Sequence, residues 1–198
     1  TLIQYLYPIF TAIFASVLLA EKLSFYLFVA IVLGFFGVYI IFDFPFIISK
    51  ELLLNGWDLL IALSGACLTG AAYVLVRKAS NLNESPYTIM FYFPLITVLI
   101  SLPFIGSVWI WPSFHCWIYI IFVGLFTQLG QIFLTFGYKI LPAGKAASAS
   151  YIQVPFSLIA GALVFNDKIS NNFILGSIII FLAIFIIIRE KQDTQFGY

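Results

Sequence analysis

Residues 5–24, YLYPIFTAIFASVLLAEKLS, and residues 151–170, YIQVPFSLIAGALVFNDKIS, are two versions of one pattern. Each begins with a tyrosine, places a proline early in a long apolar run, and ends with an acidic residue, lysine, an aliphatic residue and serine. A duplicated pair of apolar helices is typical of membrane proteins built from two related halves. Several apolar runs precede the second copy and almost none precede the first. We therefore expect the chain to be the C-terminal part of a longer protein.

The composition indicates a membrane environment. Hydrophobic residues make up 63% of the chain and charged residues only 9%, whereas soluble domains are about 25% charged. A soluble fold of this length cannot hide so much apolar surface, but a bilayer solvates it. The net charge of +1 argues against nucleic acid as a partner, because nucleic-acid binding needs a basic patch.

The apolar runs predict transmembrane helices, each needing about 20 residues. The predicted spans are 2–20, 25–42, 57–76, 86–106, 115–138, 146–165 and 171–188. Strands are not expected, because the runs are too long and lack alternation of polar and apolar residues. The predicted fold class is an all-α polytopic membrane protein with seven visible helices.

The basic residues predict the orientation, since Lys and Arg concentrate in cytoplasmic connections. Of the nine Lys and Arg residues, seven fall on the side of the C-terminus and two on the other side. The seven are Lys22, Arg77, Lys78, Lys139, Lys145, Arg189 and Lys191, and the two are Lys50 and Lys168. We expect a cytoplasmic C-terminus in a multi-pass protein of the cell membrane, the inner membrane of a bacterium.

The duplication also predicts the domains. Residues 1–42 would be the last two helices of a first repeat, 43–56 a linker, 57–189 a second repeat of five helices, and 190–198 a cytoplasmic tail. The whole protein would then have ten helices, with three further spans, or about 85–90 residues, upstream. Because five is odd, the second half would be inverted relative to the first. A short amphipathic helix on the outer membrane surface is the alternative to a plain linker at 43–56.

Uncharged polar residues supply the candidate site, because no charge is evident deep within a predicted span. Gln128 and Gln131 lie on one face of the fifth span, and hydrocarbon cannot satisfy their amides. We expect a substrate pathway lined by Gln128, Gln131, Gln153, Tyr73, Tyr138 and Tyr151. The alternatives are hydrogen bonds between helices, worth about 0.6 kcal/mol each in membranes, and interfacial anchoring of the tyrosines.

The two copies share an early proline. Pro8 and Pro155 each remove a backbone hydrogen bond, so we expect both helices to kink there. The kinks could line a cavity or act as hinges, with simple packing as the alternative. Further polar faces are Gln4, Pro8, Thr11 and Ala15 on the first span and Gly65, Thr69 and Tyr73 on the third.

Residues 5–24, followed by VLGFFGVYIIF at 32–42, resemble the drug/metabolite transporter superfamily, in particular its EamA-type domain. The segment GQIFLTFGYKILPAGKAASASYIQVPFSLIAGALVF at 130–165 is similar to the second repeat of that family. The resemblance covers nearly the whole chain and implies a ten-helix, two-repeat fold with a central cavity that works by alternating access. Asp167 and Asn166 depart from the Glu and Gly that the family commonly has there.

The expected function is that of a secondary transporter moving a small organic metabolite or drug-like solute, with a homodimer as a candidate assembly. We expect no enzyme activity, catalytic residue, metal or cofactor. The alternatives are a non-transporting structural or signalling subunit of the membrane and a membrane-embedded transferase. A transferase would need a cluster of His or acidic residues at one membrane face, and His115 has no such neighbours in sequence.

Overall fold

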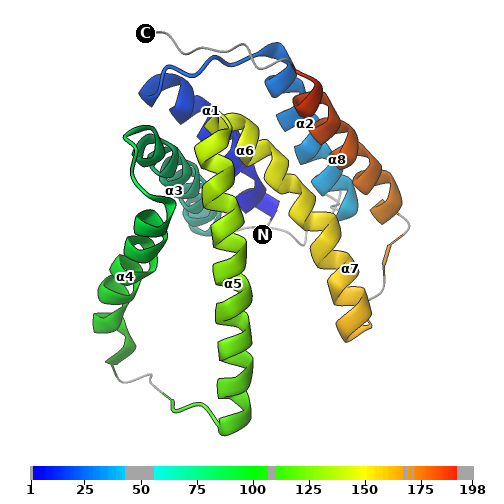
Figure 1. The fold of residues 1–198 in the computed structure, drawn as a ribbon. Helices are drawn as coiled ribbons and strands as arrows, with labels where there is room; N and C mark the ends of the chain where they lie inside the picture. The colour runs from blue at the N-terminus through cyan, green and yellow to red at the C-terminus, as the bar shows by residue number, and fades with distance from the viewer. Residues whose placement is uncertain (1, 43–55, 107–109, 167–168, 171, 191–198) are drawn as a thin grey trace. The chain divides into compact units, whose positions relative to one another are not determined.

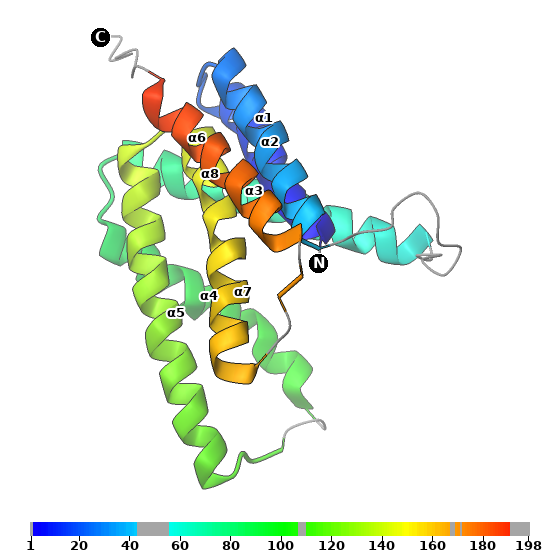
Figure 2. The same cartoon turned by 90° about the vertical axis from the view of Figure 1, so that its right-hand side faces the viewer.

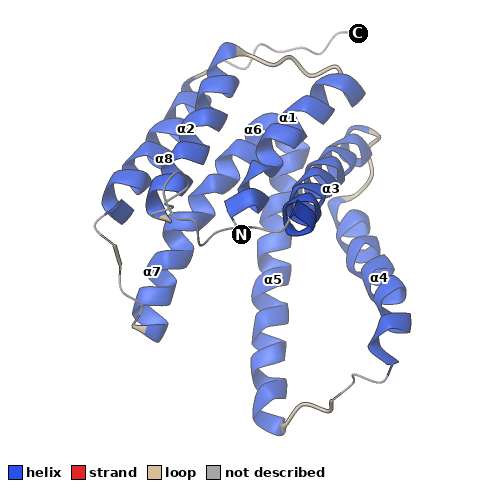
Figure 3. Cartoon of the chain, turned by 180° about the vertical axis from the view of Figure 1, so that it is seen from behind, coloured by secondary structure: helices blue, strands red, loops and turns tan. Residues whose placement is uncertain are grey.

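The computed structural model describes residues 2–42, 56–106, 110–166, 169–170 and 172–190 (Figure 1). The described part is helical and contains no strand (Figure 3). Its elements are the 3₁₀ helix η1 (Leu2–Leu6), α1 (Tyr7–Leu18), α2 (Phe25–Ile41), α3 (Gly56–Asn81), α4 (Pro86–Ile105), α5 (Phe114–Ile140), α6 (Ala143–Ala149), the 3₁₀ helix η3 (Ser150–Ile152), α7 (Gln153–Phe165) and α8 (Asn172–Arg189).

The helices confirm the predicted fold class. Among the described residues, five helical segments are long and apolar enough to cross a membrane, and one of them, Ala143–Phe165, comprises α6, η3 and α7. Ile3–Leu18 and Phe25–Ile41 are shorter apolar helices. The protein is therefore a polytopic, all-α membrane protein. The chain forms two compact units, Thr1–Val74 with Pro142–Tyr198, and Leu75–Leu141.

Two predicted spans have wrong limits. The third was expected to end at residue 76, but α3 continues to Asn81. Arg77 and Lys78 favour this extension, because both are good helix formers and a cation is stabilising near a helix C-terminus. The sixth was expected from residue 146, but helix begins at Ala143 and η3 interrupts it before α7. The predicted linker falls almost wholly on residues 43–55 and the predicted tail on 191–198, both outside the described residues.

The first unit contains an antiparallel pair, α2 and α8, which lie side by side in Figures 1 and 2. They approach most closely where both lack a side chain. A Cβ built on Gly37 would lie 2.8 Å from the carbonyl oxygen of Gly176, and one on Gly176 would lie 2.6 Å from that of Gly37. Small residues allow such backbone contact, and dispersion then holds helices together in lipid. Toward the other end of the pair, Ala30 and Ala183 share a buried apolar cluster.

The two sequence copies end their first helix in the same backbone conformation. Ala20, just after α1, has φ 52°, and Asn166, just after α7, has φ 58°. This left-handed conformation closes a helix and suits Asn, whereas Ala meets a steric penalty. Around Ala20 the turn is held by the N–H groups of Leu19 and Glu21, which both donate to the carbonyl oxygen of Ala15, at 3.0 and 3.2 Å.

The second unit contains the end of α3 and the antiparallel helices α4 and α5 (Figure 1). The turn from α3 to α4 uses Asn83 in the left-handed conformation, φ 63°. At that end of the unit, the ring of Tyr87 packs edge-on against Phe136, with centroids 6.1 Å apart. Pro94 and Pro103 lie inside α4, where sequence reasoning had singled out no feature.

Candidate functional site

The polar faces predicted on the first and third spans meet each other. The Gln4 side-chain amide donates to the Thr69 hydroxyl at 2.9 Å, and that hydroxyl donates to the carbonyl oxygen of Gly65 at 2.8 Å. Farther along, Gly70 lets the helices touch, since a Cβ there would lie 2.9 Å from the backbone nitrogen of Thr11. Gln4 and Thr69 therefore serve as a hydrogen bond between helices, which is the alternative interpretation given for such faces.

Four tyrosines form a second polar contact, which we call the tyrosine cluster: Tyr5, Tyr7, Tyr73 and Tyr151. The rings of Tyr7 and Tyr73 pack edge-on with centroids 5.4 Å apart. The Tyr151 hydroxyl donates to the carbonyl oxygen of Tyr5 at 3.0 Å. Two predicted site residues, Tyr73 and Tyr151, thus share one cluster.

The Tyr151 ring is fully buried against α2. A Cβ on Gly34 would lie only 2.3 Å from the Cδ2 atom of Tyr151, so the ring occupies the space that a side chain would need. Only 1% of Tyr151 is exposed. Gly34 is the first glycine of the segment VLGFFGVYIIF at 32–42, and nothing in the sequence indicates that Tyr151 is its partner.

Both prolines lie where 3₁₀ geometry gives way to α-helix. Pro8 is in the first turn of α1, directly after η1, and Pro155 is in the first turn of α7, directly after η3. Proline suits the first turn of a helix, because the N–H that it lacks has no partner there. Both prolines are buried. Tyr5 and Tyr151 of the tyrosine cluster lie in these two 3₁₀ segments.

The predicted face of α5 passes from exposed to buried along the helix. Gln128 is exposed and Gln131 is half-buried, and no hydrogen bond of either side-chain amide is found among the described residues. Thr135 and Tyr138 are buried, and Arg77 donates to the carbonyl oxygen of Tyr138 at 3.1 Å. The less buried part of this face therefore carries the side-chain amides of Gln128 and Gln131.

Gln153 belongs to the other unit, as do Tyr73 and Tyr151. It is the first residue of α7 and is exposed, and its side-chain amide makes no hydrogen bond in the described part of the chain. The six predicted pathway residues therefore divide equally: Gln128, Gln131 and Tyr138 in one unit, and Tyr73, Tyr151 and Gln153 in the other.

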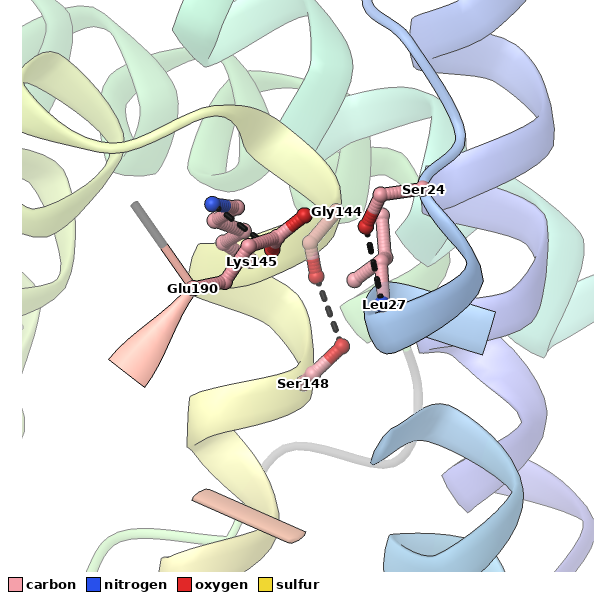
Figure 4. Close-up of polar contacts among 6 residues, drawn as sticks. All are labelled: Ser24, Leu27, Gly144, Lys145, Ser148 and Glu190. Atoms are coloured by element: carbon pink, nitrogen blue, oxygen red, sulfur yellow. Dashed lines mark hydrogen bonds and ion pairs between the residues drawn. The ribbon is translucent and has the colours of Figure 1, made fainter. Parts of the chain in front are cut away.

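A charged group in the first unit was not predicted. We call it the corner network: Glu21, Ser24, Ala143, Lys145 and Glu190. The Glu21 carboxylate accepts from the backbone N–H of Ala143 at 2.7 Å, at the start of α6. The ammonium of Lys145 lies 2.8 Å from the carboxylate of Glu190, and 13% of each side chain is exposed (Figure 4).

Ser24 completes the corner network. Its hydroxyl accepts from the N–H of Leu27 at 3.0 Å, which caps α2, and its proximity to Glu190 helps to lower the pKa of that carboxyl. Partial burial alone would raise the pKa of Glu190, but the hydrogen bonds from Lys145 and Ser24 outweigh it and lower that pKa. Glu21 and Ser24 are the acidic residue and the serine that end the first sequence copy, so the repeated pattern was a signal that could have identified them.

Comparison with known proteins identifies the family. The EamA-like transporter family matches residues 1–43 and 56–189. The chain belongs to this family. The family is one of transporters rather than enzymes, in agreement with the expectation from sequence.

Among the relatives is the S-adenosylmethionine uptake transporter of Rickettsia prowazekii, 28% identical over 98% of this chain and 64% of the relative. The pseudopaline exporter CntI of Pseudomonas aeruginosa is 24% identical over 97% of the chain and 66% of the relative. A riboflavin transporter of Vibrio cholerae is 28% identical over 89% of the chain and 57% of the relative. The chain thus spans somewhat less than two thirds of these proteins.

Proposed function

We propose that the full-length protein is a secondary transporter that moves a small organic solute across the cytoplasmic membrane by alternating access. The central observation in support is a set of three glutamines on apolar helices whose side-chain amides make no hydrogen bond to the described residues: Gln128, Gln131 and Gln153. An amide facing lipid would lose the hydrogen bonds that water gives it, at a cost of several kcal/mol. We infer that these amides face a hydrated pathway.

The arrangement of the helices supports two inverted halves. In our domain assignment α2 and α8 are the last helices of the two repeats, and they run antiparallel. Equivalent helices of the two repeats must run in opposite directions if the second repeat is inverted in the membrane. Residues 1–42 would then end the first repeat, and 57–189 would form the second.

Within each unit, the positions of the Lys and Arg residues support the proposed orientation of the protein in the membrane. In the first, Lys145 pairs with Glu190, and Ala143 meets Glu21, the neighbour of Lys22. In the second, Arg77 donates to the carbonyl oxygen of Lys139 at 2.7 Å. Basic residues therefore gather at one end of each unit, and the positive-inside rule assigns that end to the cytoplasm. We propose a bacterial inner-membrane protein with its C-terminus inside.

The relatives suggest which solutes to test. Their names include S-adenosylmethionine, pseudopaline and riboflavin, so we propose a small organic cargo. The full-length protein in proteoliposomes should carry at least one solute of this kind, measured as time-dependent flux absent from empty vesicles. Failure across a broad panel of metabolites, with folded protein in the vesicles, would contradict the proposal.

The pathway residues have a matched test. Changing Gln128 and Gln131 together to Leu should lower flux about tenfold or more, because a bound solute loses two hydrogen-bonding partners. Phe133→Leu on the exposed opposite side of α5 is the control and should leave flux unchanged. Equal flux for the double variant and the control would remove both glutamines from the pathway.

Self-association stays a prediction. Most side chains of α4 from Phe91 to Phe104 are exposed, which leaves apolar surface for lipid or a second copy. The mass of the full-length protein in nanodiscs tests this, and a single copy per disc at all loading ratios would contradict pairing.

A further inference from the structure

We propose that one face of α7, formed by Leu158 and Gly161, binds a short helix that precedes η1 in the full-length protein and is the counterpart of α6 in the first repeat. The proposal rests on the two-repeat organisation and the transport function proposed above. It assigns this surface to an upstream segment of the same protein rather than to lipid or to a second copy.

The two sequence copies, which begin at residues 5 and 151, correspond when one is displaced by 146 positions. The displacement also holds for the outer faces of the helices. Ile13 of α1 is 46% exposed, and its counterpart on α7, Ile159, is 41% exposed. Val17 is 75% exposed and its counterpart Leu163 is 79% exposed. The two copies therefore present equivalent sides to their surroundings.

The contact between α2 and α8 follows the same displacement. Gly37 meets Gly176 at one end of this helix pair, and Ala30 and Ala183 share a buried cluster toward the other end. Adding 146 to 30 gives 176, and adding 146 to 37 gives 183. The rotation that exchanges the two copies therefore carries the first pair onto the second. A pseudo-twofold axis passes between the two helices, as an inverted repeat requires.

The burial of α1 and α7 differs on the face that packs against α6. Ala12 and Ala15 of α1 are buried, at 4% and 2% exposed, whereas their counterparts Leu158 and Gly161 are half-buried. On α1 the covering element is α6, which lies between α1 and α2 (Figures 1 and 3). A Cβ on Gly144 of α6 would lie 3.4 Å from the Cβ of Ala12. The same rotation applied to α6 would cover the equivalent face of α7.

The rotation also identifies the occupant of this face. The helix α6, Ala143–Ala149, leads directly into η3. Subtracting 146 from both limits gives positions −3 to 3, so its counterpart lies mostly upstream of residue 1 and leads into η1. The relatives described above are longer than this chain, which leaves room for such a segment.

The position of η1 favours this segment over lipid or a second copy. Tyr5 of η1 packs against a buried cluster that includes Val154 of α7, and Gln4 bonds to Thr69. A segment joined directly to η1 therefore starts beside α7, at a high effective concentration that no separate molecule has. Gly161 further suits a closely packed helix, because small residues let helices approach each other in lipid.

Disulfide formation in the full-length protein lacking Cys67 and Cys116 tests the proposal. The reference pair is Ala12→Cys with Gly144→Cys, since the Cβ atoms at these positions are 3.4 Å apart. The test pair combines Leu158→Cys with a single cysteine at each position of the upstream segment in turn.

Crosslinking within one molecule should peak at the third position before Thr1, which is the counterpart of Gly144, and should recur three or four positions away, at the helical repeat. The yield at the peak should match that of the reference pair to within about threefold, because both place two Cβ atoms at disulfide distance. If Leu158→Cys does not fold, Gly161→Cys on the same face replaces it in the scan.

Leu163→Cys is the matched control, because Leu163 is exposed on the other side of α7. It should form no disulfide with any upstream position. Three results would overturn the proposal: equal yields from Leu158→Cys and Leu163→Cys, a disulfide of Leu158→Cys between two copies, or none at any upstream position while the reference pair forms. Crosslinking needs no flux, so its failure leaves the transport proposal standing. Absent flux in a protein that crosslinks as expected would overturn the transport proposal alone.

Discussion

At the scale of single residues, a few glycines decide where aromatic side chains can lie. Gly34 is the clearest case, because the Tyr151 ring fills the position of its missing Cβ. The Tyr151 hydroxyl is fixed in turn by the carbonyl oxygen of Tyr5. Position 34 thus sets the position of one end of the tyrosine cluster.

Gly34→Ala should therefore destabilise the protein. The new methyl group would overlap the Tyr151 ring, and overpacking of this kind costs about 1–3 kcal/mol. The thermal melting temperature in detergent should fall, while Gly130→Ala should not lower it, because no atom lies within 4 Å of a Cβ there. Equal melting temperatures for the two variants would show that Tyr151 does not occupy this space.

The stabilising effect of Glu190 should depend on pH. Its pKa is lower than the ordinary value of 4.5, so the folded state binds the proton less readily than the unfolded chain does. The contribution is therefore complete above about pH 4.5 and is lost as the pH falls through the lowered pKa of the folded state. The difference in melting temperature between wild type and Glu190→Gln should shrink between pH 7 and pH 4. A difference that grows on acidification would contradict the pairing with Lys145.

At the scale of helices, contacts within the membrane combine small residues with isolated hydrogen bonds. The contact of η1 and α1 with α3 has both, in Gly70 of α3 and in the bond from Gln4 of η1 to Thr69. Lipid is as apolar as the helices themselves, so hydrophobicity does not select such partners and these local features do.

The hydrogen bond between η1 and α3 should contribute little to the free energy of unfolding. Gln4→Leu, Thr69→Val and their combination form a double-mutant cycle, with an expected coupling of about 0.6 kcal/mol. Unfolding in detergent measures it. A coupling of zero would show that Gln4 and Thr69 do not interact, and Gln4 would then become a candidate for the pathway.

The positions of the helices were largely predictable from the sequence, whereas the contacts between them were not. Span positions follow from apolar length, so each apolar helix of ten or more residues in the described part of the chain lies in a predicted span. However, α3 continues past residue 76 because Arg77 and Lys78 are compatible with helix. Spacing placed Gln128 and Gln131 on one face of α5. Contacts between helices could not be predicted from spacing, because pairs such as Gln4 with Thr69 depend on which helices become neighbours.

At the scale of the whole molecule, the duplicated sequence corresponds to a duplicated structure. Each copy has a 3₁₀ segment, a proline in the first turn of the following helix, a residue in the left-handed conformation after that helix, and a second apolar helix. Their second helices, α2 and α8, run antiparallel. These features support a transporter built from two halves that face opposite sides of the membrane.

The central claim is tested most directly by the sidedness of two matching connections. Lys22 and Ser170 are exposed and lie in the equivalent connections after α1 and after α7. Each would be replaced by cysteine in the full-length protein lacking Cys67 and Cys116, and probed in intact cells with an impermeant maleimide. Position 170 should react from outside, and position 22 only after the cells are opened. Reaction of both positions from the same side would contradict the inverted halves and, with them, the proposed transport mechanism.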